Sequence, residues 1–232
     1  MPILELARKK KMSISRVEEY YNALRTNIQL SGENIRVIAI SSTFPGEGKT
    51  TTSTNLALTF AKAGHKTLLV DADIRNSKML GGVFKSDGKV TGLTEYLSGT
   101  TDLSQGLCET DEPNLFVVSS GQISPNPTAL LQSDRFATMM TVLRRHYDYI
   151  IVDTPPIGMV VDATLISRVC DASLLVVAPK EVKRKMVQRS KMQLEQSSTP
   201  FLGVVLNKYN VEADKYGFYG SYGHYGDNLS KE

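Results

Sequence analysis

Cysteine is scarce in this chain, which contains only two cysteines among 232 residues. Cys108 and Cys170 lie far apart and have no partners at metal-ligand spacing, so we expect neither a disulfide framework nor a zinc site. No Cys-x-x-Cys pair occurs, which argues against a scaffold for cluster assembly. The three histidines show no ligand spacing either. The low cysteine usage favours a reducing, cytoplasmic setting.

Long hydrophobic runs are also missing. No apolar segment approaches the roughly 20 residues that a membrane-spanning helix needs. The N-terminal stretch lacks the apolar run and the cleavage site of a signal peptide, so we expect none. The formal net charge of +3 is too small to indicate nucleic acid binding, and we expect no nucleic acid partner. Any membrane association then has to come through a partner or through the protein surface.

What the chain does contain is an alternation of short apolar runs with longer segments of helical periodicity. The apolar runs are IRVIAISS (35–42), TLLVDAD (67–73), NLFVVSS (114–120), YIIVD (149–153), SLLVVAP (173–179) and FLGVVLN (201–207). Their unbroken apolar character predicts strands that are buried on both faces. The helical segments are 49–63, 133–146, 163–170 and 182–196. This order predicts an α/β fold, a mostly parallel β-sheet with helices on both faces.

We divide the chain into three parts. Residues 1–33 combine a basic patch with a predicted helix over 13–31, for which we expect self-association; packing of an amphipathic helix on its own domain is the alternative. Residues 34–207 contain the predicted sheet and its helices. Residues 208–232 are rich in glycine and tyrosine, a composition typical of segments without fixed structure of their own.

A phosphate-binding loop follows the first predicted strand. SSTFPGEGKTT (41–51) matches the pattern G-x-x-x-x-G-K-[ST], except that Thr43 replaces the first glycine. Glycines let the backbone amides wrap a pyrophosphate, and the next helix adds its positive end. Lys49 is predicted to reach the outer phosphates and Thr50 to ligate Mg²⁺. The predicted nucleotide contacts are Pro45, Gly46, Glu47, Gly48, Lys49, Thr50 and Thr51.

Three aspartates end predicted strands and therefore share one edge of the sheet. Asp153 closes YIIVD, the place expected for a carboxylate that holds magnesium through water. Asp71 and Asp73 in LLVDADIR lie two residues apart and point to the same side of an extended chain. Two such carboxylates repel each other unless a cation lies between them, and Mg²⁺ is that cation. Arg75 lies on the same side and is expected to pair with a phosphate or a carboxylate.

The last predicted strand gives a clue to the base. Guanine-specific loops of this class read the base with Asn-Lys-x-Asp, whereas this chain has NKYN, with Asn210 in the aspartate position. We therefore predict ATP as the nucleotide, with Asn207 touching the adenine edge.

The C-terminal part contains four tyrosines at a strict spacing of three, in YGFYGSYGHYG. Alone, such a segment is most simply a weakly adhesive low-complexity tail. Beside an ATP site, it predicts phosphate acceptors at Tyr216, Tyr219, Tyr222 and Tyr225. The cationic residues of segment 182–196 are interpreted as a solvated face, with docking of acidic or phosphotyrosine segments as the alternative.

Together, PGEGKTT, LLVDADIR, YIIVDTPP, SPNPTALLQS and the tyrosine-rich end resemble the bacterial tyrosine kinases, in particular the autokinases of streptococcal capsule and exopolysaccharide operons. The resemblance implies a P-loop NTPase of the deviant Walker, MinD/ParA-like type that uses ATP and Mg²⁺. It also implies a transmembrane activator, a polysaccharide co-polymerase whose cytoplasmic tail switches the kinase on at the inner face of the plasma membrane. Autophosphorylation between subunits and reversal by a dedicated tyrosine phosphatase are implied as well.

One departure concerns the ring-forming members of that family, which carry E-x-x-R-x-x-R in the N-terminal helix. Here Glu19 and Arg25 are present but Asn22 takes the middle position, so the ring stoichiometry stays open.

From the residues, we assign Lys49 and Mg²⁺ to the developing phosphate charge, Asp71 to the acceptor phenol and its proton, and Asp73 together with Thr50 and Asp153 to the metal. The alternative function is a ParA/MinD-like ATPase switch without kinase activity. Such switches carry a second lysine early in the loop, where this chain has Phe44.

Overall fold

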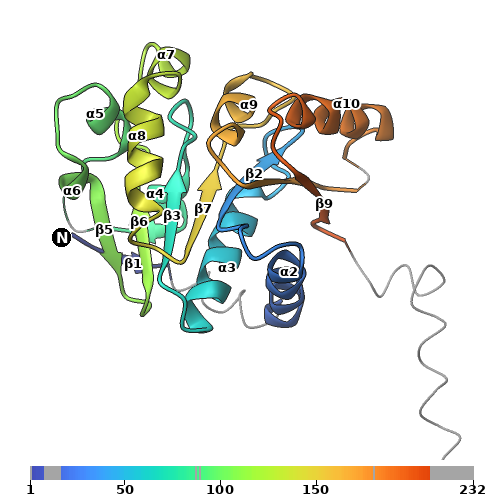
Figure 1. Ribbon diagram of the computed structural model, residues 1–232, viewed down its shortest axis with the longest axis horizontal. Helices are drawn as coiled ribbons and strands as arrows, with labels where there is room; N and C mark the ends of the chain where they lie inside the picture. Colours follow the sequence, from blue (N-terminus) through green and yellow to red (C-terminus); the bar gives the residue numbers. More distant parts are fainter. Residues whose placement is uncertain (1, 8–16, 87, 89, 180, 210–232) are drawn as a thin grey trace, which may run out of the picture.

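The computed structural model describes residues 2–7, 17–86, 88, 90–179 and 181–209. The described strands form one nine-stranded sheet in the order β4-β1-β5-β6-β3-β7-β2-β8-β9 (Figure 1). The strands are β1 (Ile3–Leu6), β2 (Val37–Ser42), β3 (Thr67–Asp71), β4 (Phe84–Lys85), β5 (Leu107–Thr110), β6 (Leu115–Val118), β7 (Tyr149–Asp153), β8 (Ala172–Val177) and β9 (Phe201–Leu206). Only the β1–β4 and β5–β6 pairs of this sheet are antiparallel, which confirms the predicted mostly parallel sheet.

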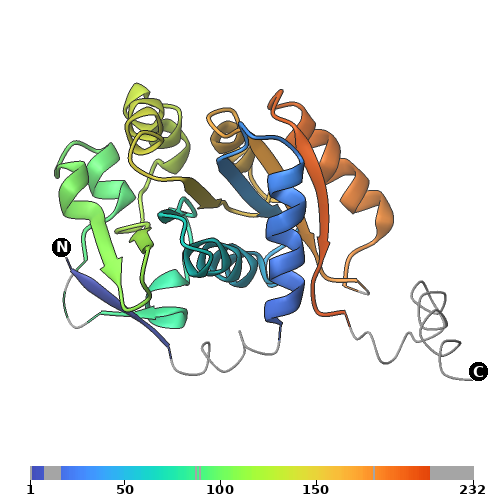
Figure 2. The ribbon, with the colours of Figure 1, turned by 60° about the horizontal axis from the view of Figure 1, so that its bottom comes forward.

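Helices cover both faces of the sheet, as predicted (Figure 2). They are α2 (Glu18–Leu30), α3 (Lys49–Lys62), α4 (Met79–Gly82), α5 (Leu93–Leu97), α6 (Leu103–Gly106), α7 (Pro127–Leu131), α8 (Asp134–Leu143), α9 (Asp162–Ser167) and α10 (Arg184–Glu195). None of the helices in the described part of the chain is long and apolar enough to cross a bilayer.

The central strands alternate their side chains between two cores. Ile38 and Ile40 of β2 pack with the buried side chains of α3, whereas Val37 and Ala39 pack with those of α8. Successive side chains of a strand point to opposite faces, so a strand between two helical layers needs apolar residues at every position. This is why the central strands appear in the sequence as unbroken apolar runs.

The edge strand β9 differs from this prediction. We expected burial on both faces, but Val204 and Leu206 are 43% and 59% exposed. The reason is its position, because β9 pairs only with β8 among the described strands and forms the edge of the sheet.

The N-terminal part contributes more than the predicted helix. Ile3–Leu6 forms β1, which pairs with β5 in parallel and with β4 in antiparallel orientation, so these residues belong to the same sheet as segment 34–207. The helix predicted over 13–31 is described from Glu18 to Leu30 as α2. It packs through buried Ile28 and through the Lys62–Glu18 ion pair of 2.9 Å, while Leu30 is exposed. The four tail tyrosines lie outside the described residues.

Candidate active site

The loop between β2 and α3 forms one wall of a pocket of about 450 Å³. Gly46 and Gly48 have φ angles of 87° and 95°, in the left-handed region that favours glycine, and α3 begins directly after them at Lys49. A Cβ atom at Gly46 would meet nothing within 4 Å, so this position opens toward the pocket. The pocket volume is typical of sites for small-molecule ligands.

Glu47 holds this loop in place from beneath. Its side chain is buried; its two carboxylate oxygens accept hydrogen bonds from the backbone N–H of Phe44 at 2.6 Å and of Ala178 at 3.1 Å. The Asn207 amide donates to the Glu47 carbonyl at 2.8 Å, and a Cβ at Gly48 would lie 1.9 Å from the same amide nitrogen. The loop is therefore fixed to the ends of β8 and β9 before any ligand binds.

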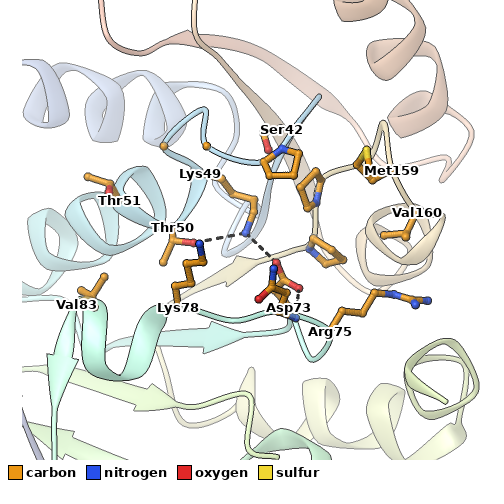
Figure 3. A pocket seen from close by; sticks show the side chains of 17 residues that line it. Ser42, Lys49, Thr50, Thr51, Asp73, Arg75, Lys78, Val83, Met159 and Val160 are labelled. Atoms are coloured by element: carbon orange, nitrogen blue, oxygen red, sulfur yellow. Dashed lines mark hydrogen bonds and ion pairs between the residues drawn. The ribbon is translucent and has the colours of Figure 1, made fainter. Parts of the chain in front are cut away.

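Lys49 forms ion pairs with two aspartates, and the one with Asp73 is drawn as a dashed line in Figure 3. Its ammonium is 3.3 Å from Asp153 Oδ1 and 3.5 Å from Asp73 Oδ2. Burial alone would lower the pKa of Lys49, but the charges of Asp153, Asp73 and Asp71 outweigh it and raise the pKa above its ordinary value. Lys49 is therefore a permanent cation in the pocket wall.

The Asp153 carboxylate organises the first turn of α3. It accepts hydrogen bonds from Thr50 Oγ1 at 2.7 Å and from Ser53 Oγ at 2.9 Å. Within the described residues no group of three or more acidic, histidine or cysteine side chains could hold a metal alone. Mg²⁺ beside a nucleotide usually keeps waters and phosphate oxygens and takes only one or two protein ligands. The Thr50 hydroxyl held against Asp153 fits such a site.

Asp71, the last residue of β3, and Asp73, two residues beyond it, occupy different environments. Asp71 is fully buried, accepts a short hydrogen bond from the Ser77 hydroxyl, and leaves its Oδ1 atom without a partner. Burial first, and the nearby Asp153 charge second, raise the pKa of Asp71 to about 7. Asp73 lines the pocket, and its Oδ1 accepts the backbone N–H of Asn76 at 3.2 Å. Of the two carboxylates, only that of Asp73 therefore lines the pocket.

Arg75 lines the pocket as well, but its guanidinium turns away from Lys49 (Figure 3). Nε and Nη2 donate to the two oxygens of buried Asp162 at 2.6 and 3.2 Å, and Nη2 also donates to Thr128 at 2.8 Å. The carboxylate partner of Arg75 is thus at the start of α9, 87 residues away in sequence.

Most of the predicted contacts meet at this pocket. The predicted residues that line it are Pro45, Gly46, Gly48, Lys49, Thr50, Thr51, Asp73 and Arg75. The others, Glu47, Asp71, Asp153 and Asn207, lie behind it. Sequence reasoning missed Ser53, Ser77 and Asp162, which hold the predicted side chains, and Lys78, which lines the pocket. A four-residue helical spacing from Lys49 could have indicated Ser53, whereas no local pattern indicates Asp162.

Comparison with known proteins adds independent findings. A family model described as AAA domain matches residues 35–189. The tyrosine-protein kinase CpsD of Streptococcus pneumoniae is 62% identical over 226 residues, which cover 97% of this chain and 99% of that protein. The kinase domain of Escherichia coli tyrosine kinase ETK has a TM-score of 0.77 at 32% identity, covering 83% of this chain and 77% of the other. The cell division ATPase MinD of Pyrococcus furiosus has a TM-score of 0.63 at 27% identity, covering 75% and 73%.

These likenesses agree with the residues. The glycine-lined loop, the aspartates at the end of β3 and the aspartate that ends β7 all lie around Lys49. The fold is that of the MinD-like P-loop NTPases. The relative that is 62% identical over 97% of this chain is a tyrosine-protein kinase. The chain therefore belongs to the bacterial tyrosine-kinase family.

Proposed function

We propose that this chain is an ATP-dependent protein-tyrosine kinase that phosphorylates the tyrosines of its own C-terminal segment 208–232. The single observation that supports this most directly is the convergence of Asp73 and Asp153 on the Lys49 ammonium, at 3.5 and 3.3 Å, beside a pocket of about 450 Å³. The 62% identity to a streptococcal tyrosine-protein kinase supports the same activity.

The pocket residues have separate tasks in this reaction. The backbone amides around Gly46 and Gly48 bind the nucleotide phosphates, and Lys49 neutralises charge on the transferred phosphoryl group. Thr50, which donates to Asp153, would hold Mg²⁺, and the ion would supply positive charge that offsets the charge of the phosphates. Lys78 contributes a second cation at the rim of the pocket.

The acceptor phenol has an ordinary pKa near 10, too high for an aspartate to deprotonate it in the ground state. Phosphoryl transfer proceeds through a loose transition state in which positioning dominates and the proton leaves late. The sequence alone suggested Asp71 as the residue that orients the phenol. Because Asp73 lines the pocket and Asp71 is fully buried, we assign the orientation of the phenol to Asp73. We assign to Asp71 a contribution to the raised pKa of Lys49, which helps to keep the ammonium charged.

The position of the tail suits this role. Strand β9 ends at Leu206, and Asn207 already contacts the phosphate-binding loop. From there, about nine residues to Tyr216 can stretch roughly 30 Å. The acceptor tyrosines of one chain can therefore enter the pocket of a neighbouring chain, and we propose transfer between subunits that associate through α2.

We further propose that a transmembrane activator holds the kinase at the inner face of the plasma membrane and that a tyrosine phosphatase reverses the modification, in the control of capsular or exopolysaccharide synthesis and export. Each phosphate adds about 1.5 to 2 negative charges, so four add roughly 6 to 8. A tail so charged is repelled by a site that holds ATP phosphates and aspartates, and we expect phosphorylation to dissociate the oligomer. Identical sedimentation of phosphorylated and unphosphorylated protein would contradict this.

The decisive test is incubation with Mg-ATP, with and without a peptide of the activator's cytoplasmic tail, followed by mass spectrometry. We expect phosphate on Tyr216, Tyr219, Tyr222 or Tyr225, and none in Lys49→Met. The matched control is Lys85→Met, because Lys85 is an exposed lysine on β4 and does not line the pocket. The likeness to MinD favours one other candidate, an ATPase switch. ATP hydrolysis without phosphotyrosine would establish that alternative.

A further inference from the structure

Helix α10 begins with a concentration of positive charge that works against its own dipole. Lys183, Arg184 and Lys185 occupy the N-cap and the first turn, which contains no acidic residue and no side-chain cap. All three are exposed and form no ion pair with the described residues. Cations at a helix N-terminus are unfavourable, since the unpaired N–H groups there already carry partial positive charge. An arrangement that weakens a helix without a compensating contact points to a ligand.

A small hollow lies further along the helix, between the middle of α10 and the loop that follows β7. Its volume is about 90 Å³, and it is lined by Gly158, Met186, Arg189, Ser190 and Gln193. Ser190 is 1% exposed, yet its hydroxyl has no hydrogen-bond partner among the described residues. Arg189 is exposed and has no ion pair within the same part of the chain. A guanidinium and an unpaired hydroxyl in a hollow of this size are suited to one phosphoryl group.

We propose that this hollow binds the phosphoryl group of a phosphotyrosine from the chain's own C-terminal segment, with the first turn of α10 contacting a second one. This inference rests on the proposed autophosphorylation of that segment. Arg189 forks onto the phosphate oxygens and Ser190 donates to one of them. Neighbouring tail tyrosines are three residues apart, at most about 10 Å, and Lys185 and Arg189 are i, i+4 neighbours on one face of α10, about 6 Å apart along its axis. Two adjacent phosphates can therefore be bound at once.

The path of the chain brings the segment to this helix. Strand β9 lies beside α10 in both views (Figures 1 and 2). Lys208, just past β9, pairs at 2.9 Å with Glu181, which lies just before α10. From Lys208 the eight residues to Tyr216 can reach about 27 Å, whereas α10 is about 18 Å long. The segment thus departs from the same end of α10 at which the unpaired cations lie.

The hollow and the nucleotide pocket lie on one loop. Gly158 lines the hollow, and the next residues, Met159 and Val160, line the nucleotide pocket. A phosphotyrosine bound at α10 is therefore withdrawn from the pocket of its own chain but stays next to it. A membrane with anionic lipids could also bind the exposed cations of α10. Such binding would not explain a hollow sized for a single phosphoryl group or a buried serine in its wall.

The test uses a fluorescein-labelled synthetic peptide of residues 216–226 with phosphate on all four tyrosines, titrated with the full, phosphatase-treated chain and followed by anisotropy. We expect binding of this peptide and none of its unphosphorylated form. Arg189→Gln should weaken binding by about tenfold or more. Arg145→Gln, an exposed arginine just beyond α8 with the same change in net charge, should leave it within about twofold. Ser190→Ala should weaken it measurably, and Lys49→Met should not.

Each contrary result has its own meaning. Equal weakening by Arg189→Gln and Arg145→Gln would reduce the interaction to net charge and overturn the proposal. If Lys49→Met lost peptide binding while Arg189→Gln kept it, the peptide would be bound in the nucleotide pocket, and the proposal would be overturned as well. So would phosphatidylglycerol vesicles that bind in an Arg189-dependent way while the peptide does not. Because the phosphates are supplied synthetically, a chain without kinase activity would still give a clear answer.

Discussion

The buried carboxylate of Asp71 should make the ligand-free protein less stable than a variant without it. Asp71 is fully buried with one oxygen unpaired, and burial raises its pKa from 3.8 to about 7. At pH 8 Asp71 is ionised in both the folded and the unfolded protein, but its pKa is about 3 units higher in the folded state. Each unit corresponds to about 1.4 kcal/mol by which the charged carboxylate destabilises the folded protein. Asp71→Asn keeps the shape and the oxygen that accepts from Ser77, so we expect it to stabilise the protein by about 2–4 kcal/mol.

The pH dependence gives this prediction a second signature. Between about pH 4 and pH 7 the folded protein holds the Asp71 proton and the unfolded chain has lost it, so the wild type loses stability as pH rises through this window. Asp71→Asn lacks this contribution. The difference in unfolding free energy between the two proteins should therefore be small near pH 4, grow by about 1.4 kcal/mol per pH unit, and level off above pH 7.

The measurement is urea unfolding of both proteins from pH 4.5 to 8.5 with EDTA and without nucleotide, together with thermal midpoints at pH 8, where we expect a rise of roughly 10 °C. Asp73→Asn is the matched control, because it removes the contact with Lys49 and should not stabilise the protein. A destabilised Asp71→Asn protein, or a difference that does not change with pH, would refute the reasoning.

Three further substitutions address the loop and the pocket rim. Gly48→Ala should abolish ATP binding, measured by calorimetry, because its Cβ would lie 1.9 Å from Asn207 Nδ2; Asn207→Ala should restore it only in part, since the φ of 95° remains unfavourable for alanine. Glu47→Gln should destabilise the protein in urea by about 1–3 kcal/mol, since one of two backbone N–H donors loses its acceptor. Lys78→Met should raise the KM for ATP severalfold without changing the unfolding free energy, and an unchanged KM would remove Lys78 from the site.

Much of this site could be predicted because its chemistry lies where strands end. The loop after β2 and the aspartates at the ends of β3 and β7 are local features, and a parallel sheet brings them to one edge. Side chains that act through distant contacts could not be found in this way. Asp162 meets Arg75 across 87 residues, and β1 is a strand only because Ile3 and Leu4 pair with residues more than 100 positions away. A strand as short as the four residues of β1 shows no recognisable strand periodicity, so it cannot be predicted before its partner strand is known.

The charges of the two sites have opposite consequences for a phosphorylated tail. Around Lys49, the carboxylates of Asp73 and Asp153 share one ammonium. Arg75 is already paired with Asp162, so the pocket favours Mg²⁺ and repels a phosphate that arrives without it. The first turn of α10 lacks acidic side chains altogether. A tyrosine is attracted to neither place by charge, but once phosphorylated it is repelled by the first and attracted by the second. The transfer of one phosphate therefore changes which site the tail prefers, from the nucleotide pocket to the hollow beside α10 on the other side of Gly158. Phosphorylation thus sets the direction in which the tail moves, and no change in the fold is needed.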